Sequence, residues 1–579
     1  MFKERQAVVV KTQTKVVGVI GSGTMGLGIV QVALLSGYQV RLYDVSQSAL
    51  DAALRNLEKR LLRLVEKGRM VETEVQTLLE RVTVSTELNV MKHAFVVIEA
   101  IPEKLSLKQE LFAKLDNLCP SDTILASNTS SLSITVLGAA TNRPHKVIGL
   151  HFFNPAPVMK LVEVIAGEDT SPETVQEMVS LAESLDKVPA ICQDTPGFIV
   201  NRVARNFYGE ALRIVAEGSA SVEQVDALLT QCAGFRMGPF RLMDLIGIDV
   251  NLDVTKAVYN AYHQEPRYRP HALQSRMVES GRLGQKTGRG FYTYGSVTDN
   301  PAETTATADL LGSGKRGQRA VVIGDTAVAL HLLQRLSHVC NKREDECGIV
   351  YPSRNQPWDL VNANWRADEV EAYLRKTKPE VVFVSLADSP SCSRRMMQAI
   401  ENAVSPETVL AVSLSGPSAT KQASWLRFPK RVRGFNVVLP LQREQAIEWS
   451  RPLQADSDVQ DTILHETFIE LGFTPLEIRD GAGGVQMRVL SMVLNEAAEA
   501  IREKVASPED VDVAMKLGTN YPHGPAAWTD VIGVPVVLST LEALSAELGD
   551  DRYRPSPLLQ QMVDAGHHGR EAGRGWYTY

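Results

Sequence analysis

Six residues near the start of the chain have the types and spacing that bind a phosphate anion. Gly-Ser-Gly-Thr-Met-Gly at 21–26 follows a β-branched run at 15–20 and precedes apolar residues at helical spacing. In such a strand–loop–helix unit the first glycine, Gly21, allows a tight turn, and Gly23 lets backbone amides approach a pyrophosphate. The third, Gly26, allows the helix to pack closely on the strand. The sequence therefore predicts an anion site at the N-terminus of this helix.

An acidic residue extends this site. A second strand is predicted at 39–43, and Asp44 follows it directly. A carboxylate about 20 residues beyond the loop accepts hydrogen bonds from an adenosine ribose and repels a 2′-phosphate. The backbone amides of Thr24 and Met25 would face the pyrophosphate, whereas the Met25 side chain packs within the helix. We therefore predict NAD as the cofactor, in preference to NADP.

Polar residues also follow three further strands, which are predicted at 95–98, 123–125 and 147–150. In an open α/β sheet, ligands bind beyond the carboxyl ends of the strands. We therefore expect these side chains to line one crevice with the glycine-rich loop. The residues concerned are Glu99, Glu103 and Lys104, then Ser127 to Ser131, then His151 and Asn154.

Length and composition limit the class of protein that carries these motifs. The chain has 579 residues, whereas a single hydrophobic core rarely exceeds about 250–300. A net charge of −7 gives no basic excess for binding nucleic acid or an anionic membrane. Six cysteines, none in a CxxC pair, argue against a disulfide scaffold and a zinc ribbon, and no metal site is predicted.

No apolar segment reaches the ~20 residues that a membrane span requires. The apolar run at 7–10, within the N-terminal tail, is too short for a signal peptide. We therefore expect a cytoplasmic location with no membrane partner.

The chain repeats itself at an offset of 285 or 286 residues. Gly-Arg-Gly-Phe-Tyr-Thr-Tyr at 288–294 recurs as Gly-Arg-Gly-Trp-Tyr-Thr-Tyr at 573–579, and Arg-Tyr-Arg-Pro at 267–270 recurs at 552–555. In each copy, strands alternate with helices first and a mainly helical pattern follows. The predicted fold class is α/β plus all-α: a Rossmann-type domain followed by a helical domain, with the pair duplicated.

This organisation predicts five parts with definite limits. A stretch rich in Thr, Ala, Gly and Ser separates the two copies. The parts are an NAD-binding domain at 15–194, a helical domain at 195–294, a linker at 295–318, a degenerate Rossmann-like domain at 319–479 and a second helical domain at 480–579.

The first copy resembles the L-3-hydroxyacyl-CoA dehydrogenases of fatty-acid β-oxidation and related pathways. The resemblance covers residues 15–294 in order. The motifs that carry it are Gly-Ser-Gly-Thr-Met-Gly at 21–26, Ile-Glu-Ala-Ile-Pro-Glu at 98–103, Ala-Ser-Asn-Thr-Ser-Ser at 126–131, Gly-Leu-His-Phe-Phe-Asn-Pro-Ala-Pro-Val-Met-Lys-Leu-Val-Glu-Val at 149–164 and Asp-Thr-Pro-Gly-Phe-Ile-Val-Asn-Arg at 194–202.

The resemblance implies roles for individual residues. His151 would be the catalytic base with Glu163 as its partner, since histidine exchanges protons near neutral pH and a carboxylate fixes its tautomer. Ser130 and Asn201 would lie at the reacting oxygen, where donors stabilise a developing alkoxide. Lys67 is a candidate for binding the CoA phosphates. The residues implied to contact the dinucleotide are Asp44, Glu99, Lys104, Ser130 and Asn154.

Structural readings compete with these roles. Glu163 could instead form a surface ion pair, and Ser130 could bond its own turn. Asn201 follows Pro-Gly at the start of a helix and could cap it. A lysine such as Lys67 on a charged helical hairpin is usually just solvated.

The second copy has lost these chemical groups. Gly-Asp-Thr-Ala-Val-Ala at 324–329 replaces the glycine-rich loop, and at an offset of 285 His151 becomes Asn436. Ser415 and Glu448 still match Ser130 and Glu163. We therefore expect the second copy to act as an internal pseudo-protomer, since members of the family typically dimerise through their helical domains. Whether the chain forms further homo-oligomers stays open.

Three functional hypotheses follow. The leading one is NAD-dependent interconversion of an (S)-3-hydroxyacyl-CoA and a 3-oxoacyl-CoA. A second is a dehydrogenase of free hydroxy or sugar acids, similar to the related gulonate dehydrogenases. A third is a non-catalytic NAD-binding scaffold. Two-copy chains of this kind resemble the enzymes for 3-hydroxyadipyl-CoA and 3-hydroxybutyryl-CoA, so both short and dicarboxylic acyl chains remain open.

Overall fold

The computed structural model describes residues 15–295, 320–342, 347–350, 367–387, 390–440, 445–456 and 458–579. The chain divides into two compact units. The first unit is Met1–Arg202 with Glu503–Thr519, and the second is Val203–Arg502 with Asn520–Tyr579. The tail at 1–14 and the predicted linker at 295–318, apart from Gly295, lie outside the described residues. Residues 503–519, part of the predicted second helical domain, therefore group with the first copy's sheet.

An eight-stranded sheet forms the centre of the first unit, in the order β3-β2-β1-β4-β5-β6-β7-β8. Neighbouring strands are parallel except for β6 and β7, which are antiparallel. The strands predicted from β-branched runs are present within one or two residues. Their bounds are β1 Val16–Ile20, β2 Gln39–Tyr43, β3 Val82–Ser85, β4 Val96–Glu99, β5 Ile124–Ser127, β6 Val147–Phe152, β7 Leu161–Ala166 and β8 Val188–Gln193.

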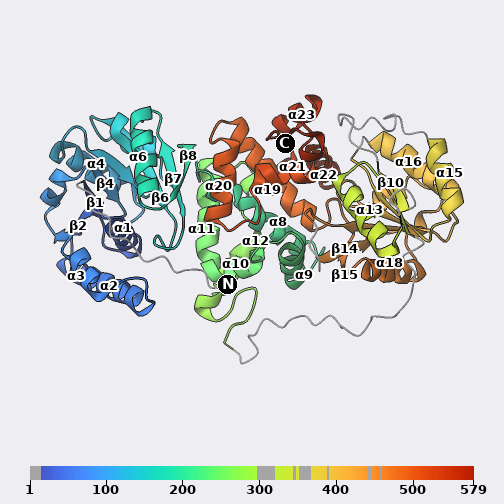
Figure 1. Ribbon diagram of the computed structural model, residues 1–579, viewed down its shortest axis with the longest axis horizontal. Helices are drawn as coiled ribbons and strands as arrows, with labels where there is room; N and C mark the ends of the chain where they lie inside the picture. The colour runs from blue at the N-terminus through green and yellow to red at the C-terminus, as the bar shows by residue number, and fades with distance from the viewer. Residues whose placement is uncertain are drawn as a thin grey trace. The chain divides into compact units, whose positions relative to one another are not determined.

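Helices lie against both faces of this sheet (Figure 1). The charged helical hairpin that carries Lys67 is a helix pair, α2 and α3, and Ser46 caps α2 by accepting the Ala49 N–H. The strand order changes direction between β1 and β4, and such a switch point is where ligands bind in open α/β sheets. The helices are α1 Thr24–Leu35, α2 Gln47–Glu66, α3 Glu72–Leu79, α4 Leu105–Leu118, α5 Ile134–Gly138, α6 Pro172–Ser184, α7 Val200–Val203 and α20 Pro508–Gly518, with short turns η1 Leu88–His93 and η2 Pro144–Lys146.

The second unit contains a second sheet with the same design. Its order is β10-β9-β11-β12-β13-β14-β15, and its only antiparallel pair among the described strands is β13 with β14. The strands are β9 Ala320–Gly324, β10 Gly348–Val350, β11 Val381–Ser385, β12 Val409–Ser413, β13 Val432–Asn436, β14 Gln445–Arg451 and β15 Phe473–Arg479. The flanking helices are α13 Ala327–Cys340, α15 Ala367–Thr377, α16 Pro390–Ala403, α17 Ala419–Ala423 and α18 Val459–Glu470, with the turn η7 Pro429–Arg431.

The rest of the second unit is helical. The segments from the first copy are α8 Arg205–Ala216, α9 Val222–Ala227, the π-helical turn η3 Leu228–Cys232, α10 Pro239–Ile246, α11 Ile248–Ala261, η4 Pro266–Tyr268, α12 Ala272–Glu279 and η5 Gln285–Thr287. Those from the second copy are α19 Gln486–Arg502, α21 Pro525–Ile532, α22 Val534–Leu548, η8 Asp551–Tyr553, α23 Pro557–Asp564 and η9 Arg570–Ala572. Together with the two sheets, they match the predicted fold class.

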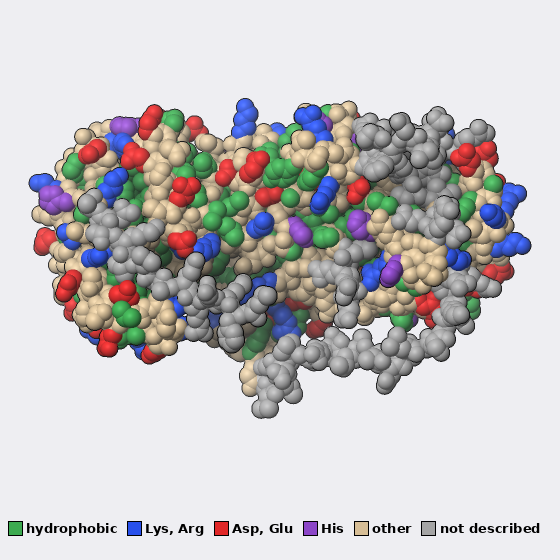
Figure 2. All heavy atoms as spheres, in the orientation of Figure 1, with side chains coloured by type: hydrophobic (Ala, Val, Ile, Leu, Met, Phe, Trp, Pro, Cys, Tyr) green, Lys and Arg blue, Asp and Glu red, His purple; other side chains and the backbone are tan. Residues whose placement is uncertain are grey.

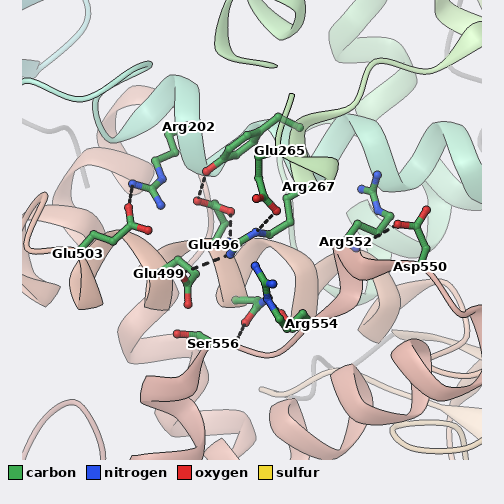
Figure 3. Close-up of polar contacts among 12 residues, drawn as sticks. Arg202, Glu265, Arg267, Glu496, Glu499, Glu503, Asp550, Arg552, Arg554 and Ser556 are labelled. Carbon is green, nitrogen blue, oxygen red and sulfur yellow. Dashed lines mark hydrogen bonds and ion pairs between the residues drawn. The ribbon is translucent and has the colours of Figure 1, made fainter. Parts of the chain in front are cut away.

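Helix α8 packs against α19 across a buried set of charges. The fully buried Glu210 accepts hydrogen bonds from Arg488 Nε and the Tyr553 hydroxyl, both at 2.7 Å. Burial would raise the pKa of Glu210, but the neighbouring Arg552 and Arg488 lower it to about 2. Figure 3 shows Arg267 pointing between carboxylates of both copies, with Glu499 Oε2 3.6 Å from its Nη1. Paired buried charges therefore join the two copies within this unit.

The repeated Gly-Arg-Gly-aromatic motifs have a structural role. In the first copy, Asp244 accepts the backbone N–H groups of Phe291 and Tyr292. In the second copy, Asp530 accepts those of Trp576 and Tyr577. The motif therefore wraps a buried carboxylate at the end of each copy.

Charged side chains of both signs are interspersed on the face that Figure 2 shows. Among the described residues, no single helix is long and apolar enough to cross a membrane, although the bent pair α21 and α22 passes that test when taken together. No group of three or more His, Cys, Asp or Glu side chains that could hold a metal ion occurs in the described part of the chain.

Candidate active site

The glycine-rich loop joins β1 to α1 in a conformation that glycine requires. Gly21 has φ of +101°, and a Cβ there would stand 2.5 Å from the carbonyl oxygen of Ala100, beyond β4. A Cβ on Gly26 would overlap the Gly21 carbonyl oxygen, so α1 starts against its own loop. These contacts correspond to the tight turn and the close helix–strand packing expected from the sequence.

Gly23 leaves room at the start of α1. Apart from Gly23 itself and its two neighbours in the chain, no described residue has an atom within 4 Å of the position that a Cβ on Gly23 would take. Gly23 is also the N-cap of α1, and no side chain of the described residues caps the helix there. The first amides of α1, including those of Thr24 and Met25, can therefore donate to an anion, and the positive end of the helix dipole favours one. The residues present fit a dinucleotide pyrophosphate.

Asp44 follows β2 and is tied to the same loop. Its Oδ2 accepts hydrogen bonds from the backbone N–H of Ser22 at 2.9 Å and from the Ser22 hydroxyl at 2.7 Å. Partial burial would raise the pKa of Asp44, but the bonds from Ser22 outweigh it and hold the pKa below its usual value. A charged carboxylate therefore stands at the strand end where a ribose would be recognised.

Glu99 is completely buried at the end of β4, and protein groups occupy both of its oxygens. Oε1 accepts the Ile101 N–H at 2.7 Å and lies 3.0 Å from Lys108 Nζ, while Oε2 accepts the Ser127 hydroxyl at 2.6 Å. The Glu99 side chain therefore joins the end of β4 to the end of β5 and to α4.

Lys108, for which the sequence predicted no role, and Glu103 hold the neighbouring loop. The ammonium group of Lys108 lies 2.8 Å from Glu103, whose Oε1 accepts the backbone N–H groups of Ser130 and Ser131. Burial would raise the pKa of Glu103, but the Lys108 charge lowers it below its usual value. A sequence signal for Lys108 existed: it lies in line with the buried residues Phe112 and Leu115 of α4.

His151 and Glu163 face each other across the antiparallel pair β6 and β7. His151 Nδ1 lies 2.7 Å from Glu163 Oε2, with the residue His151 8% exposed and Glu163 fully buried. The other carboxylate oxygen accepts the backbone N–H groups of Ile199 and Val200 at 3.1 and 2.9 Å. The reading of Glu163 as a surface ion-pair residue is therefore wrong, because its side chain is inaccessible to water.

The remaining predicted residues occupy varied positions. Asn201 directly follows Val200 in α7, and Ser130 lies partly exposed in the loop held by Glu103. Lys104 and Asn154 are exposed beyond β4 and β6, and Lys67 is exposed at the C-terminal end of α2. Ser130, Lys104 and Asn154 follow the carboxyl ends of strands in the first sheet. Asn201 lies in the helix whose start is bonded to Glu163, and Lys67 has neither position.

Comparison with known families agrees with this geometry. The model of the 3-hydroxyacyl-CoA dehydrogenase NAD binding domain matches residues 16–195. The model of the 3-hydroxyacyl-CoA dehydrogenase C-terminal domain matches twice, at 197–294 and 483–579. The chain belongs to the 3-hydroxyacyl-CoA dehydrogenase family. Its cofactor is NAD, in agreement with the prediction from the glycine-rich loop and Asp44.

Relatives in this family differ in how much of the chain they match. The 3-hydroxyadipyl-CoA dehydrogenase of Escherichia coli K12 is 36% identical over 554 residues, 95% of this chain and 98% of that protein. A probable 3-hydroxybutyryl-CoA dehydrogenase of Bacillus subtilis is 46% identical, but its alignment covers 49% of this chain and 99% of the relative. The crystal structure of an E. coli K12 3-hydroxybutyryl-CoA dehydrogenase has a TM-score of 0.74 at 34% identity, covering 96% of this chain and 100% of that one.

The second sheet of this family member presents different groups at the same places. Thr326 caps α13 by accepting the Ala329 N–H at 3.1 Å, so a hydroxyl takes the amide that Gly23 leaves accessible in the first copy. Asn436 and Glu448 are directly opposite on β13 and β14, as His151 and Glu163 are on β6 and β7. The second copy thus keeps the strand register and the carboxylate but has an amide in place of the imidazole.

Proposed function

We propose that this dehydrogenase interconverts an (S)-3-hydroxyacyl-CoA and the 3-oxoacyl-CoA, with His151 as the general base. The observation that carries the proposal is the 2.7 Å contact between His151 Nδ1 and the buried Glu163 carboxylate. A carboxylate accepts only, so Nδ1 carries a proton and Nε2 of the neutral ring is left with its lone pair. Nε2 is then the atom that takes the substrate hydroxyl proton during oxidation and returns it during reduction.

Glu163 has two tasks in this proposal. Through Oε2 it fixes the tautomer of His151 and stabilises the imidazolium that forms when the proton arrives. Through Oε1 it holds the backbone of Ile199 and Val200, and so the start of the helix that carries Asn201. Removal of its side chain would affect the base and the placement of Asn201 together.

Ser130 and Asn201 would donate hydrogen bonds to the reacting oxygen as it becomes negative. The second copy supports this placement for Ser130, since its counterpart Ser415 donates to Asn436, the counterpart of His151, at 2.8 Å. When bound, NAD supplies the acceptor for the hydride, and the loop at 21–26 and Asp44 would hold it. Lys104 and Asn154 would contact the dinucleotide, and Lys67 is the candidate for the CoA phosphates.

We propose one active site per chain. The second copy lacks the histidine, and Thr326 caps the helix that follows its loop. The predicted limits 15–194, 195–294, 319–479 and 480–579 are retained as the functional domains, with the second pair serving as an internal partner. The substrate class follows from the family, while the two E. coli proteins carry the names of a dicarboxylic and a short acyl-CoA substrate.

The test is NADH formation from a panel of (S)-3-hydroxyacyl-CoA thioesters that includes 3-hydroxybutyryl-CoA and 3-hydroxyadipyl-CoA, beside the free hydroxy acids. We expect turnover with the thioesters and little with the acids. His151→Ala should lower kcat by about 10²- to 10⁴-fold without changing NADH binding. Near-wild-type turnover in that variant, or a preference for free acids, would contradict the proposal.

A further inference from the structure

Strand β8 is the last strand in the order of the first sheet, so its outer edge has backbone donors to satisfy. Two of them bond to residues from the second copy. The Ile191 N–H donates to Asp510 Oδ1 at 2.9 Å, and the Gln193 N–H donates to the Val505 carbonyl at 2.8 Å. Helix α20 and the turn before it therefore cover the edge of the sheet that carries the candidate active site.

The same segment approaches the strand and helix that hold Glu163. A Cβ added to Gly518, the last residue of α20, would lie 2.8 Å from Leu161 Cδ2 and 2.9 Å from Val200 Cγ2. Leu161 begins β7, two residues before Glu163, and the Val200 N–H donates to Glu163 Oε1. Only glycine permits this approach without displacing one of the two side chains.

A third contact lies beside Asn201. The guanidinium of Arg202, only 1% exposed, donates to Glu503 Oε2 at 2.8 Å, and Figure 3 shows the two side chains pointing toward each other. The residues at 503–519 therefore contact β7, which carries Glu163, its neighbour β8, and α7, whose Val200 N–H donates to Glu163.

We propose that residues 503–519 of the second copy form a positioning element for the active site of the first. By holding Leu161 and Val200, this segment fixes the Glu163 carboxylate and, through it, the ring of His151. A displacement of about 1 Å in such a group can cost about 100-fold in rate. The inference rests on the proposed roles of His151 and Glu163.

The second unit contains the equivalent contacts, which can serve as a control. In that unit, residues of the first copy contact the sheet of the second copy. There the Arg479 N–H donates to the Ser219 carbonyl at 2.9 Å, and Gln224 donates to the Glu477 carbonyl at 2.8 Å. Cys232, at the repeat position of Gly518, donates its thiol to the Ala446 carbonyl at 2.9 Å. This second set supports a sheet without a catalytic histidine, so its loss should affect stability but not turnover.

The experiment compares variants of the full chain with 3-hydroxybutyryl-CoA as the probe. Gly518→Val and Asp510→Ala are the test variants, and Asp510→Asn keeps an oxygen for the Ile191 N–H. The controls on the exchanged side are Cys232→Val and Gln224→Ala. NADH binding stoichiometry gives the folded fraction, and kcat is expressed per NADH site.

We expect Gly518→Val to lower kcat per site by about 10- to 100-fold and Asp510→Ala by a smaller factor. The dissociation constant of NADH should be unchanged, and Asp510→Asn should restore most of the activity. If Gly518→Val does not fold, Asp510→Ala against Asp510→Asn decides the question. Wild-type kcat in the test variants, or equal losses in both controls, would overturn the inference. Failure of the proposed function would appear separately, as an active His151→Ala enzyme.

Discussion

His151 on β6 and Glu163 on β7 are directly opposite residues of an antiparallel strand pair, and their side chains are 2.7 Å apart. In the second copy the directly opposite residues at this place are Asn436 and Glu448. The carboxylate of each pair also accepts two backbone N–H groups at the start of a helix. The carboxylate at this position thus holds the start of a helix in both copies and contacts a histidine in the first copy.

Glu163→Gln tests whether the charge of Glu163 contributes to catalysis through His151. An amide can still accept a backbone N–H, but it no longer stabilises an imidazolium or selects the tautomer of His151. We expect kcat to fall by about 10²- to 10⁴-fold, measured as NADH formation from 3-hydroxybutyryl-CoA. The matched change Glu448→Gln should leave kcat at the wild-type value. A similar loss in both variants would mean that Glu163 acts only through the fold.

Glu448 predicts a pH dependence of stability in the second copy. Burial raises the pKa of Glu448 from its usual 4.5 to about 8. Between these values the folded state binds more protons than the unfolded state, so the free energy of unfolding falls as pH rises from about 4.5 to about 8. Glu448→Gln is neutral throughout and should be more stable than the parent at pH 8, on the order of a few kcal/mol, with no gain below pH 4.5.

Tryptophan fluorescence in urea measures this effect, because all six tryptophans lie between residues 358 and 576. Glu477→Gln is the control, since the Glu477 side chain is 54% exposed. Its difference from the parent should be small and should not change with pH. A gain from Glu448→Gln that is equal at pH 4 and pH 8 would contradict the assigned titration.

Neutralising Glu210 should weaken the packing of α8 against α19. Glu210→Gln leaves the positive charges of Arg488 and Arg552 without their buried partner, which we expect to cost about 3–5 kcal/mol of unfolding free energy. The pKa of Glu210 is about 2, below its usual 4.5, so its contribution is present above pH 4.5 and is lost as pH falls toward 2. Urea unfolding at pH 7 and pH 3 should show a smaller difference at pH 3.

The comparison variant is Glu217→Gln, which removes a second partner of Arg488 whose side chain is 44% exposed. An exposed pair contributes at most about 1 kcal/mol. Equal losses of unfolding free energy from Glu210→Gln and Glu217→Gln would show that burial does not control the strength of the ion pairs between α8 and α19.

Asp44 should determine the choice of dinucleotide. Asp44→Asn keeps an oxygen for the Ser22 hydroxyl but removes the negative charge that repels a 2′-phosphate. We expect the NADH dissociation constant to rise about tenfold and NADPH binding to improve, both measured by fluorescence titration. Asp51→Asn, an exposed change on α2, is the control and should alter neither constant. An unchanged preference for NADH in Asp44→Asn would exclude this role.

The glycine-rich loop and its strands were predictable because their interactions are local. Gly21, Gly26 and Asp44 lie within 24 residues of one another, and β-branched runs and glycine conformations have strong short-range preferences. The repeat was equally visible, since equal offsets need no structure to detect. The contact of Glu99 with Lys108 was harder to predict, because a carboxylate at a strand end is equally suited to a ligand or to a buried lysine.

The sequence alone determined the family motifs, the NAD loop, the alternation of strands and helices, and which copy retains the histidine. Only the tertiary structure determined the strand register that puts His151 opposite Glu163, because a slip of one residue would turn either side chain to the other face. It also decided that Asp510 and Gly518 contact the sheet of the first copy, more than 300 residues away in sequence. Such contacts depend on how a covered strand edge and a helix end fit together, and no local pattern records that fit.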